Sequence, residues 1–176
     1  MTVNNLTVRT EHQSGPINIL DNLNFKLESG KSLGVVGESG CGKSTLARAI
    51  LRLVPSTAGQ IVWMGQSIEG WSTRQVRPLR RDLQIVFQDP LASLDPRMTV
   101  GEIVAEPLRV HAPELSKAER RERVADILRR VGLSPDVINR YPHEFSGGQC
   151  QRIGIARAMV LRPKLLVCDE PVSALD

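Results

Sequence analysis

The residues best suited to chemistry lie in a glycine-rich stretch, Gly37–Ser44, which reads GESGCGKS. This stretch follows the short apolar run SLGVV and precedes KSTLARAILRLV, whose apolar spacing is typical of a helix. The pattern GxxxxGK[ST] between a strand and a helix predicts a loop that binds nucleotide phosphates. Glycines let consecutive backbone N–H groups curl around the phosphates, and the helix N-terminus adds unpaired donors.

Individual residues of this loop have separate expected roles. Lys43 is expected to reach the β- and γ-phosphates as a catalytic residue, Ser44 to bind Mg²⁺, and Thr45 to donate to the α-phosphate. The predicted nucleotide-binding residues here are Gly37, Glu38, Ser39, Gly40, Cys41, Gly42, Lys43, Ser44 and Thr45. The alternative is an ordinary glycine-rich turn, which the combination of strand, motif and helix disfavours.

A second group of polar residues follows apolar runs that are typical of strands. Asp169 and Glu170 come directly after LLVC, and Gln88 comes directly after LQIVF. Ligands bind at the carboxyl ends of strands in open α/β sheets, so we expect Asp169 to hold Mg²⁺ and Glu170 to act as general base on a water. Gln88 could reach both the metal and the water, or it could be an ordinary loop residue, and its context leaves both open.

The stretch HEFSGGQCQR, residues 143–152, begins another predicted helix with two adjacent glycines. Ser146 and Gln149 fit a capping box, but the box does not require Gly147 and Gly148, each of which costs a helix roughly 1 kcal/mol relative to alanine. Glycines leave the donors of a helix N-terminus open to phosphate. Ser146, Gly147, Gly148 and Gln149 are therefore predicted to bind phosphate. The chain then has two helix starts suited to phosphate, here and at Gly37–Ser44, whereas one nucleotide has a single γ-phosphate.

The surrounding pattern alternates between strands and helices. Residues 2–8 and 23–27 are expected to form antiparallel strands, whereas SLGVV, LQIVF and LLVC lack alternation, which favours a parallel sheet. Residues 88–161 are helical in pattern, with capping boxes at Thr99–Glu102 and Ser116–Glu119 and a stop at Gly132. The sequence thus predicts an α/β fold with an inserted helical segment.

Composition sets broad limits on function. The 176 residues are 41% hydrophobic and 24% charged, a composition that excludes a disordered chain. The net charge of +4 is small and its basic residues are interleaved with acids, which favours an ordinary soluble protein over one that binds nucleic acid. No apolar run approaches the ~18 residues of a membrane span, and the N-terminus lacks the apolar core of a signal peptide. We therefore expect a cytoplasmic protein unless a partner carries it to a membrane.

Taken together, the motifs identify the chain as similar to the ATP-binding-cassette (ABC) ATPases. Gly37–Ser44 resembles a Walker A motif, LLVCDE a Walker B motif, and FSGGQ the LSGGQ signature, while Gln88 is placed like the Q-loop glutamine and SALD at 173–176 resembles the start of the D-loop. The resemblance implies ATP and Mg²⁺ as ligands and ATP hydrolysis as the activity. It also implies a head-to-tail dimer in which the signature of one subunit meets the ATP on the other.

The resemblance assigns the elements to two domains and the protein to a subfamily. Residues 1–88 and 162–176 resemble the P-loop core, with a mostly parallel sheet and an antiparallel N-terminal β subdomain, and residues 89–161 resemble the helical signature subdomain. QDPLASLDPR and YPHEFSGGQCQRIGIARA resemble the oligopeptide, dipeptide and nickel importers. That subfamily implies peptide import, with two permease subunits, a second identical or different ATPase subunit, and indirectly a solute-binding protein. Its members lie peripherally on the cytoplasmic face of the bacterial inner membrane.

The sequence departs from the family pattern at three places. Thr10 occupies the position where family members place an aromatic residue against adenine, with His12 nearby, and Phe145 replaces the commoner leucine of the signature. The sequence stops at Asp176, before the family's switch histidine, so residues 1–176 alone are expected to hydrolyse ATP poorly.

Other functions compete with peptide import. A soluble ABC-type ATPase of DNA repair or translation normally carries long inserts or tandem cassettes, which this sequence lacks. A nucleotide-binding fragment without turnover is a further alternative, which the presence of Glu170 disfavours for the full protein. Cys41 is expected to be a reactive thiol, because it lies in the phosphate loop beside a helix N-terminus.

Overall fold

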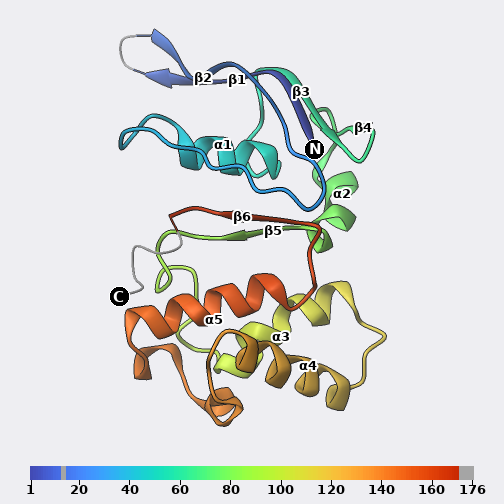
Figure 1. Ribbon diagram of the computed structural model, residues 1–176, viewed down its shortest axis with the longest axis vertical. Coiled ribbons are helices and arrows are strands. Elements are labelled where there is room, and N and C mark those ends of the chain that lie inside the picture. The colour runs from blue at the N-terminus through green and yellow to red at the C-terminus, as the bar shows by residue number, and fades with distance from the viewer. Residues whose placement is uncertain (13–14, 171–176) are drawn as a thin grey trace. The chain divides into compact units, whose positions relative to one another are not determined.

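The computed structural model describes residues 1–12 and 15–170. The chain divides into two compact units, residues 1–77 and 78–176, and each has a sheet of its own (Figure 1). The mixed α/β class predicted from the sequence is confirmed. The expected D-loop start, SALD at 173–176, lies outside the described residues.

The first unit contains a four-stranded antiparallel sheet in the order β2-β1-β3-β4. Its strands are β1 (Thr2–His12), β2 (Gly15–Lys26), β3 (Ala58–Trp63) and β4 (Gln66–Ser67). The predicted antiparallel pair is confirmed, but β1 and β2 extend beyond the expected strands at residues 2–8 and 23–27. Val3, Leu6 and Ile61 are almost fully buried. Val3 and Leu6 are three positions apart in β1 and are both buried because the β1–β2 register shifts between them.

Two helices belong to this unit, α1 (Lys43–Ile50) and the short α2 (Thr73–Val76). Helix α1 contacts β2 and buries Leu46, Ala47, Ala49 and Ile50. It is shorter than the predicted helical stretch KSTLARAILRLV, residues 43–54, because Arg52 takes a left-handed conformation (φ 56°) and Leu53 N–H donates to the Arg48 carbonyl at 2.8 Å. A left-handed residue of this kind commonly ends a helix.

The apolar run SLGVV, residues 32–36, forms no strand, contrary to the prediction. Its five residues are all exposed, and Val36 is 93% exposed. A strand exists only through ladder bonds to a neighbour. The four-stranded sheet does not include the run, so within the described residues of this unit the run has no ladder partner.

The second unit combines a parallel strand pair with a group of helices. Strands β5 (Leu83–Val86) and β6 (Leu165–Cys168) pair in parallel, as their unalternating apolar sequences predicted. The main helices are α3 (Val100–His111), α4 (Lys117–Arg130) and α5 (Gly147–Met159). Short 3₁₀ turns are η1 (Arg77–Arg81), which begins at the last residue of the first unit, η2 (Pro135–Asn139) and η3 (Pro142–Glu144).

The helices of this unit share one apolar core. Helix α5 contacts α3, α4 and β5, and buried residues between Leu94 and Leu161 form one hydrophobic cluster (Figure 1). Both predicted capping boxes are confirmed, at the starts of α3 and α4. Gly132, at φ 77°, follows the end of α4 as expected.

Helix lengths are modest throughout the described part of the chain. Helix α4, one of the longer helices, has 14 residues, whereas a membrane span needs about 20 apolar ones. None of the helices within residues 1–12 and 15–170 is both long and apolar enough to cross a bilayer.

Candidate functional site

The glycine-rich loop folds into an open start for helix α1. Gly40 and Gly42 take positive φ angles of 81° and 101°, and Cys41 N–H donates to the Glu38 carbonyl at 3.3 Å. A Cβ on Gly42 would lie 3.0 Å from the Ile19 carbonyl oxygen, so this position requires glycine. No side chain caps α1 and no acidic residue lies in its first turn. The backbone donors of this turn are therefore presented to an anion.

Lys43 is bent back over the same loop. Its Nζ donates to the carbonyl oxygens of Gly37 and Glu38, both at 2.9 Å. The start of the loop is also tight, because a Cβ on Gly37 would lie 2.6 Å from the Cys41 sulfur. Ser44 and Thr45 follow in the first turn of α1 and are half-buried. The loop thus places a cation, hydroxyl groups and backbone donors within one short segment.

In the second unit, the parallel strand pair brings two predicted catalytic residues together. Gln88 Nε2 donates to Glu170 Oε2 at 2.6 Å, beyond the carboxyl ends of β5 and β6. Asp169 is buried, and its N–H extends the ladder by donating to the Val86 carbonyl at 3.0 Å. Glu170 is exposed with φ 47°, a left-handed conformation that is costly for a residue with a Cβ. Such strain in non-glycine residues concentrates at functional sites.

The sequence left the role of Gln88 open, and its hydrogen bond joins it to Glu170, the predicted general base. The predicted site residues divide between the units. Lys43 and Ser44 belong to the first unit, and Gln88, Asp169 and Glu170 belong to the second. Thr10 and His12 are exposed residues of β1.

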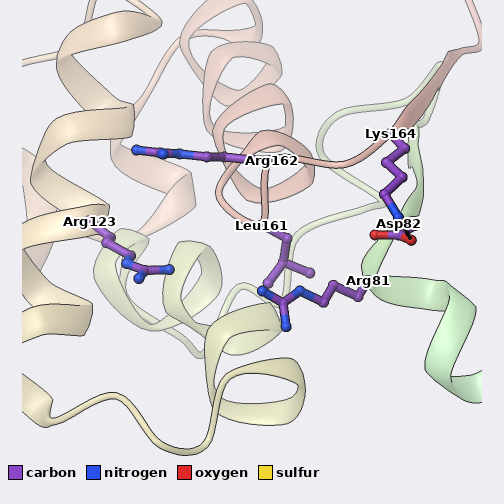
Figure 2. A pocket seen from close by; sticks show the side chains of 6 residues that line it. All are labelled: Arg81, Asp82, Arg123, Leu161, Arg162 and Lys164. Atoms are coloured by element: carbon purple, nitrogen blue, oxygen red, sulfur yellow. Dashed lines mark hydrogen bonds and ion pairs between the residues drawn. The ribbon is translucent and has the colours of Figure 1, made fainter. Parts of the chain in front are cut away.

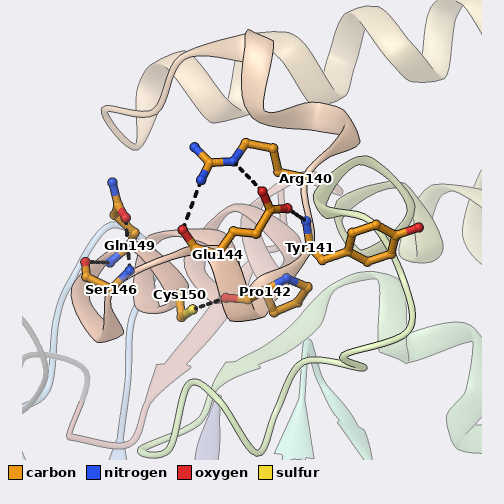
Figure 3. Close-up of polar contacts among 7 residues, drawn as sticks. All are labelled: Arg140, Tyr141, Pro142, Glu144, Ser146, Gln149 and Cys150. Carbon is orange, nitrogen blue, oxygen red and sulfur yellow. Dashed lines mark hydrogen bonds and ion pairs between the residues drawn. The ribbon is translucent and has the colours of Figure 1, made fainter.

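Helix α5 begins as the sequence predicted. Ser146 N–H donates to Gln149 Oε1 at 3.0 Å, and Gln149 N–H donates to Ser146 Oγ at 3.3 Å (Figure 3). The first turn of α5 contains no acidic residue, whereas α3 has Glu102 and α4 has Glu119 at the equivalent capping position. Helices α1 and α5 are therefore the two main helices whose first turns carry no negative charge to repel a phosphate.

Packing does not account for the glycine at the start of α5. Within the described residues, no heavy atom lies within 4 Å of a Cβ built on Gly147, apart from neighbouring residues and the helix's own backbone. Gly101, in the first turn of α3, is different, because a Cβ there would lie 2.6 Å from Ile138 Cγ1 and 2.9 Å from its carbonyl oxygen. Gly101 is thus a packing glycine, whereas Gly147 leaves open space at the helix N-terminus.

A group of side chains before α5, which the sequence reasoning missed, fixes how the chain enters this helix. Glu144 Oε2 accepts from Tyr141 N–H at 2.6 Å, and Arg140 donates to Glu144 Oε1 at 3.2 Å and to the Glu144 carbonyl at 3.0 Å (Figure 3). Arg140 also lies over the Phe145 ring at 4.6 Å, and Cys150 Sγ contacts the Pro142 carbonyl at 3.4 Å.

These contacts make Glu144 an anchor for the segment before the helix. The Tyr141 N–H, and after it Arg140, hold the pKa of Glu144 below its usual value. The sequence signal was a glutamate three residues after Tyr141, which resembles a capping box. Tyrosine is not among the usual capping residues, so the pattern was easily overlooked.

Comparisons with known proteins agree with this geometry. The sequence model of the ABC transporter family matches residues 20–173. The chain is 61% identical over 154 residues to the oligopeptide transport ATP-binding protein OppF of Haemophilus influenzae, covering 88% of this chain and 46% of that protein. It is 56% identical over 160 residues to the di/tripeptide transport ATP-binding protein DppF of Pseudomonas aeruginosa, covering 91% of this chain and 49% of that protein. The chain therefore spans about half the length of these relatives.

Solved structures show the same likeness. A dimeric, post-hydrolysis structure of the ATP-binding cassette MJ0796 bound to ADP and Pi matches with a TM-score of 0.92 and 32% identity, covering 99% of this chain and 75% of that one. A second dimeric MJ0796 structure, described as a bacterial ABC transporter cassette, matches with a TM-score of 0.93 at the same identity and coverage. Because the family match contains both the phosphate loop and FSGGQ, this chain is a member of the ABC transporter family.

Proposed function

We propose that this chain carries the nucleotide-binding part of an ATP-hydrolysing subunit that powers import of peptides or similar small solutes. Two relatives that support the proposal are named as peptide transport ATP-binding proteins. The observation that carries it is the contact between Gln88 and Glu170 at the ends of β5 and β6, because it joins the proposed general base to a second polar side chain that follows the neighbouring strand.

ATP would bind through the glycine-rich loop. The residues that would surround its phosphates are Gly37, Glu38, Ser39, Gly40, Cys41, Gly42, Lys43, Ser44 and Thr45. The uncapped start of α1 supplies N–H donors, and Lys43 supplies a cation that now rests on two loop carbonyls. Exchange of these carbonyls for phosphate oxygens would strengthen the lysine's hydrogen bonds, since phosphate carries full negative charge.

The proposed Mg²⁺ ligands fit the preference of this ion for oxygen. They are the Ser44 hydroxyl, the Asp169 carboxylate and the Gln88 amide oxygen. Because Gln88 donates to Glu170 through Nε2, its oxygen is the atom left for a cation. When bound, Mg²⁺ would neutralise charge on the phosphate oxygens.

Glu170 would act on the attacking water. Its carboxylate is exposed and accepts a hydrogen bond from Gln88, and a carboxylate held in this way can take a proton from water. Gln88 would hold the carboxylate in place and orient the same water. Lys43 would stabilise the charge that develops on the γ-phosphate.

Helix α5 would serve the ATP of a second ATPase subunit. Ser146, Gly147, Gly148 and Gln149 would bind that phosphate, because the first turn of α5 is neutral and Gly147 leaves space beside it. The dimeric state of the two MJ0796 structures supports this arrangement. The second subunit could be identical or different.

The rest of the proposed assembly extends the resemblance to the peptide importers. Two permease subunits would receive this subunit at the cytoplasmic face of a bacterial inner membrane, and a solute-binding protein would act through them. Within the chain, residues 1–88 and 162–176 would form the P-loop core and residues 89–161 the helical subdomain. The apolar cluster between Leu94 and Leu161 supports the second boundary.

The test is Glu170→Gln in the full-length protein assembled with its ATPase partner. Loss of a general base should lower the rate of phosphate release roughly 100- to 10,000-fold. Binding of a fluorescent ATP analogue should remain, because Glu170 is not part of the phosphate loop. Glu122→Gln, an exposed glutamate of α4, is the matched control and should keep full turnover. Unchanged phosphate release by Glu170→Gln would contradict the proposed role.

A further inference from the structure

A basic hollow lies in the second unit, at the end of the parallel strand pair opposite Gln88 and Glu170. Its volume is about 630 Å³, within the range of small-molecule sites. Figure 2 shows the side chains that line it, which are Arg81, Asp82, Arg123, Leu161, Arg162 and Lys164. Asp82 and Lys164 lie at the amino ends of β5 and β6, whereas Gln88 and Glu170 follow the carboxyl ends of the same strands.

The charge of the hollow is strongly unbalanced. Four of its six lining residues are cationic and one is anionic, an excess of three positive charges in a chain whose total is +4. The single acid is already used, because Asp82 pairs with Lys164 at 2.8 Å. The charge of the hollow toward a ligand therefore comes mainly from its three arginines, Arg81, Arg123 and Arg162. The planar guanidinium group of arginine suits phosphate oxygens.

Backbone hydrogen bonds fix one wall of the hollow. The Asp82 carbonyl accepts from the N–H groups of Lys164 and Leu165, at 3.0 and 2.9 Å, which joins the two strands at the wall of the hollow. Leu161 is buried and forms an apolar wall. Sites held by strands and helix ends are better positioned than sites on loops.

Arg162 has an unusual conformation for its residue type. It follows the end of α5 with φ 54°, and its N–H donates to the Met159 carbonyl at 2.9 Å. Helix ends of this kind usually take glycine or asparagine in the left-handed position. The chain carries an arginine there instead, and that arginine lines the hollow.

From the cavity, its charge and this placement, we infer that the hollow binds a small anion that carries two or more phosphate groups. The volume exceeds the needs of a single phosphate, and arginines from three separate segments line it, at the end of η1, in α4 and after α5. A polyphosphate chain or a nucleoside polyphosphate has this chemistry. A phospholipid headgroup shares the phosphate chemistry, and the experiment separates the two sources.

The test uses the full-length protein with Lys43→Ala to weaken binding at the phosphate loop. Calorimetry without Mg²⁺ should detect inorganic tripolyphosphate bound to one site. Arg123→Gln and Arg162→Gln should each weaken this binding about tenfold or more, because each removes a charge-assisted contact. Arg129→Gln changes the same net charge on an exposed residue of α4 outside the hollow and should leave the affinity as it was.

Three outcomes would overturn the inference. The first is the absence of tripolyphosphate binding. The second is an equal loss from Arg129→Gln and Arg162→Gln, which would mean diffuse attraction by net charge. The third is Arg162-dependent binding to vesicles of phosphatidylglycerol and phosphatidylcholine without binding of tripolyphosphate, which would assign the hollow to a membrane lipid. Circular dichroism shows whether each variant is folded. Arg81→Gln replaces any variant of the hollow that misfolds, because Arg81 also lines the hollow.

Discussion

At the scale of the residue, Cys41 is the side chain that shapes the start of the phosphate loop. Its sulfur occupies the space beside Gly37 where a Cβ would lie at 2.6 Å, yet the residue is exposed. Any group added to the sulfur must therefore extend into the loop or into the solvent in front of it. Cys150 is different, because it is buried and its burial raises the pKa of its thiol.

Alkylation of Cys41 should abolish ATP binding, because the adduct would occupy the space that the phosphates need. Bound ATP should protect the thiol in turn. Cys168 is also exposed, so the experiment requires Cys168→Ser to make the reaction selective. Mass spectrometry measures the extent of modification and a fluorescent nucleotide measures binding. Full modification with unchanged nucleotide binding would contradict this prediction.

At the scale of the element, the four main helices differ in the charge of their first turns. Helices α3 and α4 use glutamate as the acidic partner of the capping box, α5 uses glutamine, and α1 has no box. Glutamate and glutamine serve equally as the acceptor for the N-cap N–H. They differ in charge, because a glutamate repels an approaching anion and a glutamine does not. The glutamine of α5 is therefore best explained by an anionic ligand rather than by helix stability.

Gln149→Glu should therefore separate stability from function. The capping box remains possible, so the free energy of unfolding should change by no more than about 1 kcal/mol. A carboxylate at the start of α5 would repel the γ-phosphate, and ATP hydrolysis by the assembled dimer should fall at least about tenfold.

The exchange in the other direction provides the control. Glu119→Gln changes a glutamate to glutamine in the same type of box, at the start of α4, and should leave ATP hydrolysis unchanged. If Gln149→Glu retained the turnover of the unaltered dimer, the proposed contact between α5 and phosphate would be wrong.

The capping carboxylate of α3 should make stability depend on pH. The N–H and then the hydroxyl of Thr99 hold the pKa of Glu102 below its ordinary value of 4.5. A group whose pKa is lower in the folded state stabilises fully above its unfolded pKa, and this contribution declines as the pH falls through the folded pKa.

Glu102→Gln keeps the box but removes this titration. The difference in unfolding free energy between the parent and the variant should therefore be constant above about pH 5 and should shift in favour of the variant at lower pH. Urea denaturation at a series of pH values measures it. A difference that is independent of pH would show that Glu102 contributes nothing through its charge.

At the scale of the whole molecule, the start of α5 points to a requirement for a second subunit. The loop at α1 and the turn at α5 are both suited to phosphate, and one nucleotide has a single γ-phosphate. The second phosphate would come from another chain. The two dimeric MJ0796 structures are consistent with such an arrangement.

Gly147→Leu should block the contact between α5 and the partner's phosphate without unfolding the chain. The space beside Gly147 accepts a side chain, so thermal stability should change little. The leucine would occupy the place of the partner's phosphate, and the dimer should lose ATP hydrolysis while each monomer still binds ATP. Gly148, the next residue, should respond in the same direction.

Gly101→Leu provides the contrast, because its side chain would collide with Ile138 and should destabilise the second unit. Loss of ATP binding by the Gly147→Leu monomer would mean that the turn acts on the ATP of its own chain, which contradicts the proposal.

The sequence by itself determined the local elements, because their signals lie within a few residues. The capping boxes at Thr99, Ser116 and Ser146 and the stop at Gly132 needed only neighbours in the chain, and the structure confirms them. The phosphate motif and the family were equally local, since fixed spacings carry them.

Long-range contacts were decided by the tertiary structure alone. The bond between Gln88 and Glu170 joins residues 82 positions apart, and no local pattern encodes it. The run SLGVV has the composition of a strand but forms none, because a strand depends on a partner that its own sequence does not specify. The basic hollow likewise collects residues from three separate segments, whose charges interleave with acids in the sequence and gather only when the chain folds.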